Sequence, residues 1–453
     1  MISQNVYELQ VKKDLKDITK DEIIFSNTIN EPSMNLGFQY FIHRKKDEMS
    51  ITNNLSKFYY IVNPYEHIIN DYDDDLLNIT KKYLSIKEKD PKILSRAFYK
   101  LWEILFVFDL AKESKMTYAG LAEGPGAFIQ AVIHFRKKFY DIKKDKVYGV
   151  TIHPENKKDI SMAKQFLGHY NDLVPKMVNI HKTYDLKTCK KYNSKKGSYK
   201  ARDNGDITKV NTISNFKKSV LKSKKYADLV TADGGFVWDN ENYQEMESYQ
   251  LVLGQMVAAI RVQNKGGSFV LKIFETFTLV SLKMIYLLSS FYNKCYIYKP
   301  FYSRESNSEK YVIFKDFKYD PKKDSKYLDS KIKILESLLE KMSSEKYVFD
   351  IFPNLELSKN FINTFIYFNT KIANSQQIMI NNIITYIKEN NYFGEKYHNY
   401  KRNQIEKTKE WSKIFMPNSD KEFSALNSKL KSDLIKKINF NNKEINLFVS
   451  KLN

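Results

Sequence analysis

Apolar and polar positions alternate in a regular way from about Pro91 onward. Short apolar runs bounded by glycine or charged residues alternate there with segments of helical length and spacing. Four of these runs are predicted to be strands: Tyr118–Ala122, Val147–Ile152, Ala227–Ala232 and Ser268–Phe274. Strands that alternate with helices are typical of a parallel sheet covered by crossover helices. The sequence therefore predicts an α/β fold with a Rossmann-like, doubly wound and mostly parallel sheet.

The pattern changes on the C-terminal side of this region. Cys295–Tyr298 and Tyr311–Phe314 are close enough in the sequence to form an antiparallel hairpin at the sheet edge. Strand signals fade after about Asp320. Three amphipathic helices with many lysines are predicted beyond it: Leu328–Met342, Ile372–Lys388 and Phe423–Phe440. We therefore divide the chain into an N-terminal extension (1–86), a central domain (87–320) and a basic, mainly helical C-terminal module (321–453).

Two other stretches need an interpretation. The N-terminal extension has no sustained period, although Phe58–Val62 is compatible with a strand. The most apolar stretch, Phe274–Tyr292, contains Glu275, Lys283 and several hydroxyl residues. Those polar groups make a membrane span unfavourable, so we predict a buried helix there.

Charge changes the picture by pointing to the partner. The chain has 74 basic and 53 acidic residues, a formal charge of +21, and its 42% hydrophobic content excludes a wholly disordered protein. Such an excess favours nucleic acid or an anionic membrane face, although acidic partners in general remain open. Lys187–Lys200, with Tyr192 and Tyr199, is predicted to be a surface insertion. It is either a solvated loop or a segment that grips phosphates and stacks on bases.

Cysteine content limits the compartment and the kind of site. The two cysteines, Cys189 and Cys295, exclude a disulfide scaffold and a multi-cysteine zinc site, and we expect no metal. The first residues lack the apolar core of a signal peptide. We expect an intracellular protein that does not enter a membrane.

A glycine-rich turn follows the first predicted strand of the central domain. It consists of Glu123, Gly124, Pro125, Gly126, Ala127 and Phe128. Such a turn lets a ligand approach the backbone and directs helix amide groups toward it, although Gly-Pro-Gly also makes ordinary turns. The dinucleotide fingerprint needs a further glycine where Ile129 stands, which counts against a nicotinamide or flavin enzyme. S-adenosylmethionine, which carries no phosphate, remains compatible.

Three charged residues are candidates for the chemistry. Asp233 directly follows a predicted strand and so should lie at the ligand crevice of a parallel sheet. Asp206 also follows a strand-like segment and is about equally well explained as a turn or helix cap. Lys272 lies within an apolar strand, where it either points to water or is a desolvated amine able to take a proton from a hydroxyl.

Five blocks stand in order between about residues 90 and 320. They are Ser95–Ile104, Glu123–Phe128, Asp233–Phe236 with Gln244–Glu245, Gly266–Phe274, and Ser303–Arg304 with Asn307–Tyr311. The first resembles the Ser-Arg-Ala-x-x-Lys-Leu-x-Glu-Ile signature that opens the FtsJ-like RNA ribose 2'-O-methyltransferases, and the second resembles that family's methionine-binding turn. The last three resemble the cap-specific mRNA (nucleoside-2'-O-)-methyltransferase branch, which includes enzymes of large DNA viruses. Five ordered blocks are far more specific than any one of them.

The resemblance implies roles for individual residues. The family's catalytic Lys-Asp-Lys-Glu tetrad falls on Lys100, Asp233, Lys272 and Glu309. Lys272 is the candidate base, while Lys100 would disfavour its protonated form and the two carboxylates would orient both lysines. Because carboxylates also raise a lysine pKa, the direction of the net shift stays open.

The cofactor implied by the resemblance is S-adenosylmethionine. Its expected site comprises Glu123, Gly124, Pro125, Gly126, Ala127 and Phe128 of the turn, Thr151, Asp206 on the adenine side, and Asp233 near the sulfonium. Thr151 stands where the family often has an acidic residue for the ribose hydroxyls. Binding of the cofactor ribose is therefore expected to use another group or to be weaker.

The expected activity is methyl transfer to a ribose 2'-hydroxyl of RNA, at the first transcribed nucleotides of capped mRNA. Ribosomal or transfer RNA is the alternative substrate. A non-catalytic RNA-binding subunit of a capping complex is an alternative of another class, and a capping enzyme or RNA polymerase is then the expected partner. The abundance of Asn, Ile and Lys hints at an AT-rich genome. The expected location is a cytoplasmic virus factory or virion for a viral protein, and the nucleus for a cellular one.

Overall fold

The computed structural model describes most of the chain. The described residues are 6–10, 18–29, 32–53, 55, 57–66, 76–142, 145–152, 178–180, 205–222, 224–235, 240–342, 347–390 and 393–451. The predicted insertion Lys187–Lys200, together with Cys189, lies outside these ranges.

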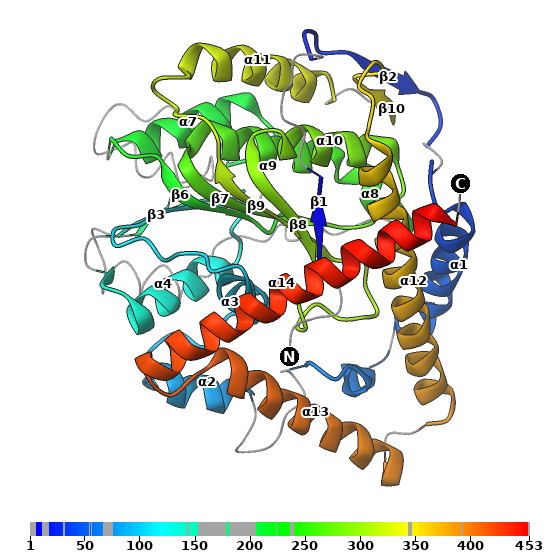
Figure 1. The fold of residues 1–453 in the computed structure, drawn as a ribbon. Coiled ribbons are helices and arrows are strands. Elements are labelled where there is room, and N and C mark those ends of the chain that lie inside the picture. Colours follow the sequence, from blue (N-terminus) through cyan, green and yellow to red (C-terminus); the bar gives the residue numbers. More distant parts are fainter. Residues whose placement is uncertain are drawn as a thin grey trace, which may run out of the picture.

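A single sheet of eight strands organises the molecule (Figure 1). Its strands are β1 (Val6–Leu9), β3 (Thr117–Leu121), β4 (Lys146–Val150), β5 (Val178–Ile180), β6 (Ala227–Ala232), β7 (Gln263–Ile273), β8 (Tyr292–Tyr298) and β9 (Lys310–Phe317). They lie in the order β1-β8-β9-β7-β6-β3-β4-β5. The five strands from β5 to β7 are parallel to one another, whereas β9 is antiparallel to both β7 and β8. The predicted mostly parallel, Rossmann-like sheet is confirmed.

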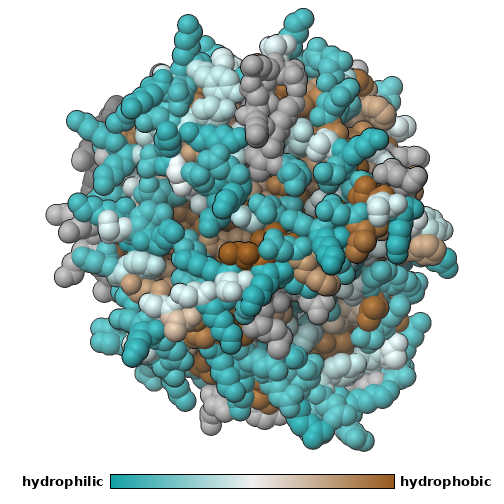
Figure 2. Space-filling view, in the orientation of Figure 1, coloured by the Kyte–Doolittle hydropathy of each residue, from teal (hydrophilic) through white to brown (hydrophobic). Residues whose placement is uncertain are grey.

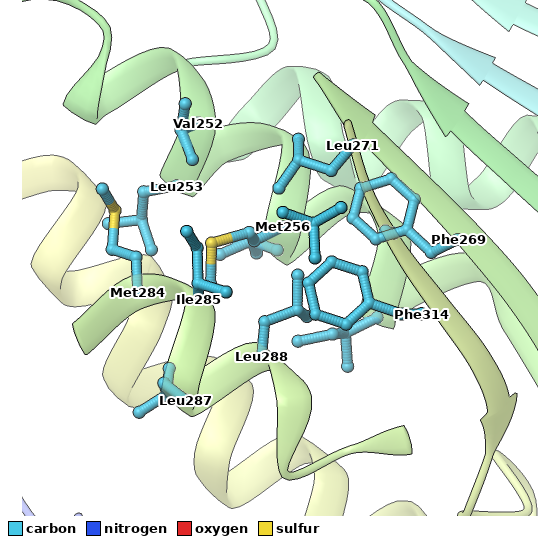
Figure 3. Packing of buried hydrophobic residues seen from close by; sticks show 14 of the residues in the cluster. Val252, Leu253, Met256, Phe269, Leu271, Met284, Ile285, Leu287, Leu288 and Phe314 are labelled. Atoms are coloured by element: carbon cyan, nitrogen blue, oxygen red, sulfur yellow. The ribbon is translucent and has the colours of Figure 1, made fainter. Parts of the chain in front are cut away.

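Helices cover both faces of this sheet. They are α3 (Ala97–Val107) and α4 (Ala127–Phe139) on one face, and α7 (Val210–Leu221), α9 (Tyr249–Val262), α10 (Leu279–Ser289) and α11 (Ser325–Lys341) on the other. Each face has its own hydrophobic cluster: the first lies under α3 and α4, and the second under α7, α9, α10 and α11. Because side chains alternate along a strand, Tyr118 of β3 belongs to the first cluster and Ala119 to the second. Figure 3 shows the second cluster, in which Met256 and Leu288 from the helices pack against Phe269 and Phe314 from the strands. Burial on both faces explains why these strands read as continuous apolar runs.

Most of the elements predicted from the pattern are present. The four predicted strands coincide with β3, β4, β6 and β7, apart from a few residues at their ends. The predicted hairpin is β8 and β9. The three predicted C-terminal helices correspond to α11, which ends one residue earlier than predicted, and to parts of the longer helices α12 (Lys359–Lys388) and α14 (Asp420–Ser450). The apolar stretch from Phe274 contains the buried helix α10, and its two charged residues are paired: Glu275 with Lys46, and Lys283 with Asp350. Among the described residues, no helix combines the length and the hydropathy needed to cross a membrane.

Two expectations were wrong. Phe58–Val62 is not a strand but lies in the 3₁₀ helix η2 (Lys57–Val62). Its Ile61 and Val62 are buried against α12, so helix packing rather than strand pairing satisfies their hydrophobicity. The hairpin does not form the sheet edge, because β1 pairs antiparallel with β8 along its outer side.

The two flanking segments pack directly on the central sheet. Their remaining elements are β2 (Ile23–Ser26), α1 (Leu36–Glu48), η1 (Met49–Thr52), α2 (Leu76–Leu84), β10 (Tyr347–Ile351) and α13 (Gly394–Phe415). Helix α14 crosses β1 and α3, α12 runs beside α1, and β2 pairs with β10 (Figure 1). Figure 2 shows that the resulting surface is mainly hydrophilic on the face seen there. The N-terminal and C-terminal segments therefore share the two large hydrophobic clusters of the central region. They also form a smaller cluster with each other, in which Ile61 and Val62 pack against Met379 and Ile383.

Candidate active site

The four expected catalytic side chains come from four different elements. Asp233 directly follows β6, and Lys272 lies near the carboxyl end of the adjacent strand β7. Glu309 immediately precedes β9, which runs antiparallel to β7, so the start of β9 lies beside the end of β7. Lys100 lies in α3. The topology therefore directs all four toward the same edge of the sheet, where parallel strands place their ligand sites.

The side chains of this tetrad meet as two ion pairs. Lys100 Nζ lies 2.6 Å from Glu309 Oε1, and Lys272 Nζ lies 3.1 Å from Asp233 Oδ1. Lys272 also donates to the main-chain oxygen of Asp233 at 2.7 Å. The hydroxyl of Tyr311 lies 3.1 Å from Asp233 Oδ1 and 3.4 Å from Glu309 Oε1, and so links the two pairs. Sequence reasoning gave Tyr311 no role, although it stands two residues after Glu309.

Burial and opposite charges act against each other in this cluster. Burial by itself raises the pKa of Glu309, but Lys100 and Lys272 outweigh burial and hold that pKa well below its ordinary value. Burial lowers the pKa of Lys100, with Arg96 acting in the same direction and Glu309 opposing both. Glu309 is therefore an anion over the whole physiological range, while the ammonium form of Lys100 is disfavoured.

The two glycines after Asp233 meet different neighbours. A side-chain carbon at Gly235 would lie 3.4 Å from Lys272 Nζ. At Gly234 it would lie 2.4 Å from Gln255 Oε1, the atom that accepts the Gly234 amide at 3.0 Å. The Gln255 side chain therefore anchors the backbone next to Asp233 and requires a glycine there.

The glycine-rich turn connects β3 to α4 at the same edge of the sheet. Gly126 has φ 109°, a left-handed conformation that favours glycine, and it precedes the first residue of α4. Ala127 and Phe128 are buried at the start of the helix.

The side chain of Glu123 connects this turn to the neighbouring strands and to α4. Its carboxylate accepts from Tyr118 Oη at 2.8 Å, from Thr231 Oγ1 at 3.3 Å and from the Ile129 amide at 3.3 Å. Burial raises the pKa of Glu123 to about 8, despite these hydrogen bonds. The described contacts therefore give Glu123 the task of shaping the turn.

Thr151 and Asp206 flank a region of the chain in which the structure describes only β5 and the residues next to these two. Thr151 is buried just beyond β4. Asp206 Oδ1 accepts from the amide of Thr208 at 3.0 Å and from its hydroxyl at 2.7 Å, which is the arrangement of a local turn. Their roles toward a cofactor stay predictions.

A cleft of about 730 Å³ opens next to the tetrad. Glu309, Phe274 and Arg304 line one side, while the N-terminal segment contributes Tyr59 and Tyr60. Helix α12 adds a third wall, and Asp47 and Glu241 place carboxylates on the lining. No local pattern in the sequence places the two flanking segments here, because the contacts join residues that are far apart along the chain.

Lys299 is a further functional candidate that sequence reasoning missed. It is buried beyond β8 and donates to the main-chain oxygens of Asn307 at 2.9 Å and Glu309 at 2.8 Å, and to Ser303 Oγ at 3.2 Å. Burial lowers the pKa of Lys299 to about 7. The side chain therefore organises the loop that ends at Glu309. Its position after an apolar strand was the available signal.

Residues 93–317 match the family model of the FtsJ-like methyltransferases. The chain therefore contains an FtsJ-like methyltransferase domain over these residues. The chain is 33% identical over 244 residues to the "Cap-specific mRNA (nucleoside-2'-O-)-methyltransferase 1" of Mus musculus. This alignment covers 50% of this chain and 26% of the mouse protein. It is 26% identical over 399 residues to the protein of the same name from Caenorhabditis elegans, covering 87% of this chain and 37% of that one. Because 399 residues exceed the FtsJ-like domain, the second similarity extends into the flanking segments.

A solved structure gives a weaker similarity. A protein from Plasmodium falciparum, named as a ribosomal RNA methyltransferase, is 20% identical, with a TM-score of 0.33. The match covers 49% of this chain and 97% of that one.

An FtsJ-like domain implies S-adenosylmethionine as the cofactor, and the residues present fit it. The Asp233 carboxylate, about one-fifth exposed, provides the negative charge that a sulfonium or an ammonium group attracts. The turn at Gly126 brings backbone, without side chains, to the start of α4, where amide groups favour a carboxylate. Both features lie at the edge of the sheet that holds the tetrad.

Proposed function

We propose that this chain transfers a methyl group from S-adenosylmethionine to a ribose 2'-hydroxyl near the 5' end of capped RNA. The observation that carries the proposal is the assembly of two lysines and two carboxylates into adjoining ion pairs beside an open cleft. The basic surface charge of the chain favours RNA as the polymer.

The reaction needs alignment and a base. The cofactor supplies an activated methyl group, so the protein has to orient the hydroxyl and take its proton. In our assignment the neutral amine form of Lys272 accepts that proton at Nζ and becomes an ammonium group paired with Asp233, because Nζ lies at the end of β7 next to the space left by Gly235. Asp233 holds Lys272, and the Lys100–Glu309 pair lies across Tyr311 from it.

The lining of the cleft supports a capped 5' end as the substrate. A methylated guanine is a cation, which aromatic faces and carboxylates attract. The ring centroids of Tyr59 and Tyr60 lie 4.6 Å apart, with the rings edge to face. Both tyrosines line the cleft together with Asp47 and Glu241. Capping-enzyme or polymerase partners, and an intracellular location, stay predictions.

The deciding experiment compares capped and uncapped RNA of one sequence as acceptors of labelled methyl from S-adenosylmethionine. We expect transfer to capped RNA, at a ribose 2'-oxygen identified by nuclease resistance of the adjacent bond. Equal transfer to both RNAs would favour ribosomal or transfer RNA instead. Tight RNA binding without any transfer would favour a non-catalytic subunit.

The role of Lys272 is tested within the same assay. In Lys272→Ala we expect turnover to fall by roughly 100-fold or more, the usual scale for loss of a general base, while cofactor binding persists. Lys283→Ala is the matched control, because Lys283 is also buried and ion-paired but contacts Asp350 instead of the tetrad. Normal turnover in Lys272→Ala would refute the assignment.

A further inference from the structure

A buried carboxylate of the N-terminal segment lies between two arginines. Glu66 is 0% exposed. Its Oε2 accepts from Arg96 Nη1 at 2.9 Å and from Arg304 at 2.8 Å (Nε) and 2.7 Å (Nη2). The two arginines are 30 and 238 residues from Glu66 along the chain, so the contact joins three distant segments.

Each arginine is close in the chain to one member of the Lys100–Glu309 pair. Arg96 caps the start of α3, and Lys100 follows it one turn later, with its amide donating to the Arg96 oxygen at 3.3 Å. Arg304 lies in the loop between β8 and β9, five residues before Glu309. Glu66 therefore connects the helix that carries Lys100 to the loop that carries Glu309.

The Glu66 carboxylate offsets the repulsion between the two arginines. Both guanidinium groups are charged. Burial lowers the pKa of Arg96, and the charge of Arg304 acts in the same direction, while Glu66 opposes both. Glu66 offsets one of the two charges. The remaining charge lies at the cleft, where Arg304 stacks 3.7 Å above the ring of Tyr60.

We propose that Glu66 is a positioning residue for methyl transfer. By holding Arg96 and Arg304 on one oxygen, it fixes α3 against the loop that ends at Glu309, and so sets the geometry of the Lys100–Glu309 pair. The inference rests on the proposed function for the reaction being aligned. It gives the N-terminal segment a part in the active site, through a residue outside the FtsJ-like match.

If Glu66 only stabilised the fold, its substitution would lower stability without lowering the turnover of folded molecules. A second buried carboxylate–arginine pair provides the matched control. Arg136 and Asp145 form another buried pair, with bonds of 2.6 and 3.0 Å. Asp145 directly precedes β4, at the amino ends of the parallel strands and therefore at the edge opposite the tetrad. Asp145→Asn leaves a buried arginine without its carboxylate, as Glu66→Gln does, but far from the reacting groups.

The experiment measures turnover per cofactor-binding molecule for the full chain and for Glu66→Gln, Asp145→Asn and Arg304→Gln. Counting active molecules by S-adenosylmethionine binding removes the effect of unfolded protein. We expect both carboxylate variants to unfold at lower temperature. Of these two, only Glu66→Gln should lose turnover, by roughly 10- to 100-fold as for a small misplacement of reacting groups, with the KM for the cofactor changed by less than about twofold.

Arg304→Gln keeps the experiment decisive where Glu66→Gln folds poorly. It leaves Glu66 paired one-to-one with Arg96, so it should fold normally and still lose turnover. Adding Glu66→Gln to it should cost much less than the product of the two single losses, because the residues act through one another. Wild-type turnover per active molecule in Glu66→Gln, or fully multiplicative losses, would overturn the proposal.

Measuring turnover on both capped and uncapped RNA distinguishes a failure of this inference from a failure of the proposed function. Turnover is measured on whichever RNA the wild-type chain methylates. If that RNA is uncapped, the cap assignment fails while the ratio between variant and wild type still judges Glu66. If capped RNA is methylated and Glu66→Gln is unimpaired, only the positioning role fails. Transfer to no RNA overturns both.

Discussion

Helix α3 carries two buried charged groups three residues apart that meet opposite surroundings. Lys100 joins the tetrad, where every charge has a counter-charge. Glu103 instead accepts from neutral donors, Tyr298 Oη at 2.6 Å and Trp411 Nε1 at 2.9 Å, besides the Phe301 amide. Burial raises the pKa of Glu103 to about 7, whereas the lysines lower that of Glu309. The neighbours, not the depth of burial, decide the charge state of each carboxyl group.

The two environments also have different tasks. Glu103 ties α3 to β8 and to Trp411 of α13, and so fastens the C-terminal segment to the central sheet. The tetrad ties the same helix to the ends of β6, β7 and β9, where ligands bind. One helix therefore transmits the packing of the C-terminal segment to the position of a catalytic candidate.

The largest expected effect comes from breaking the compensation of charges in the tetrad. In Lys100→Met we expect turnover to fall by roughly 100-fold or more, because Glu309 loses its closest partner and shifts from its place. The free energy of unfolding should fall by about 3 kcal/mol, the scale for leaving a buried charge unpaired. Methyl-transfer assays and urea denaturation measure the two. The double variant Lys100→Met with Glu309→Gln should recover stability but not turnover; recovery of both would contradict the catalytic assignment.

The second effect concerns Glu103 and the dependence of stability on pH. The unfolded carboxyl ionises near pH 4.5 and the folded one near pH 7, so the folded state holds the extra proton between these values. The wild-type free energy of unfolding should therefore decline by about 3 kcal/mol relative to that of Glu103→Gln as pH rises through this window. Denaturation curves at several pH values test it, and parallel profiles would show that Glu103 titrates normally.

Glu309 sharpens the comparison because its sign is opposite. Its folded-state pKa is lowered, so its contribution to stability is complete above the unfolded pKa and is lost as pH falls. Relative to Glu309→Gln, wild-type stability should decline on acidification below about pH 4.5. A decline on raising the pH instead would contradict the ion pairing seen here.

The smallest effect is expected from the hydroxyl that links the two ion pairs. Tyr311→Phe removes contacts of 3.1 Å to Asp233 and 3.4 Å to Glu309 while keeping the buried ring. A hydrogen bond of about 1 kcal/mol corresponds to roughly a fivefold loss of turnover. Single-turnover rates measure this. A loss as large as that of Lys272→Ala would instead give Tyr311 a direct part in the reaction.

In the central region, local patterns in the sequence were sufficient to predict the strands. Strands such as Ala227–Ala232 are buried on both faces and bounded by turn residues, so their apolar runs are visible in the sequence. The motifs at Lys100, Asp233, Lys272 and Glu309 named the tetrad through a family resemblance, and the fold brings these four residues together.

What the sequence could not supply were contacts between distant segments. Strand β1 has only four residues, and its pairing with β8 has no local signal. The pairing of Glu66 with Arg96 and Arg304, and the entry of Tyr59 and Tyr60 into the cleft, depend on tertiary packing in the same way. Phe58–Val62 shows the converse, since its strand-like composition yielded to packing against α12.

The pairing of β1 with β8 determines what happens when the N-terminal residues are removed. Its four residues occupy the outer side of β8, and the side chain of Asn441 from α14 donates to the Val6 oxygen. A shortened version that starts at the first family motif would leave the main-chain groups of Cys295–Tyr298 that now pair with β1 without their partners. Such a row of groups is a template for adhesion between molecules. Aggregation of a shortened protein would therefore reflect a bare strand and say nothing about its capacity for chemistry.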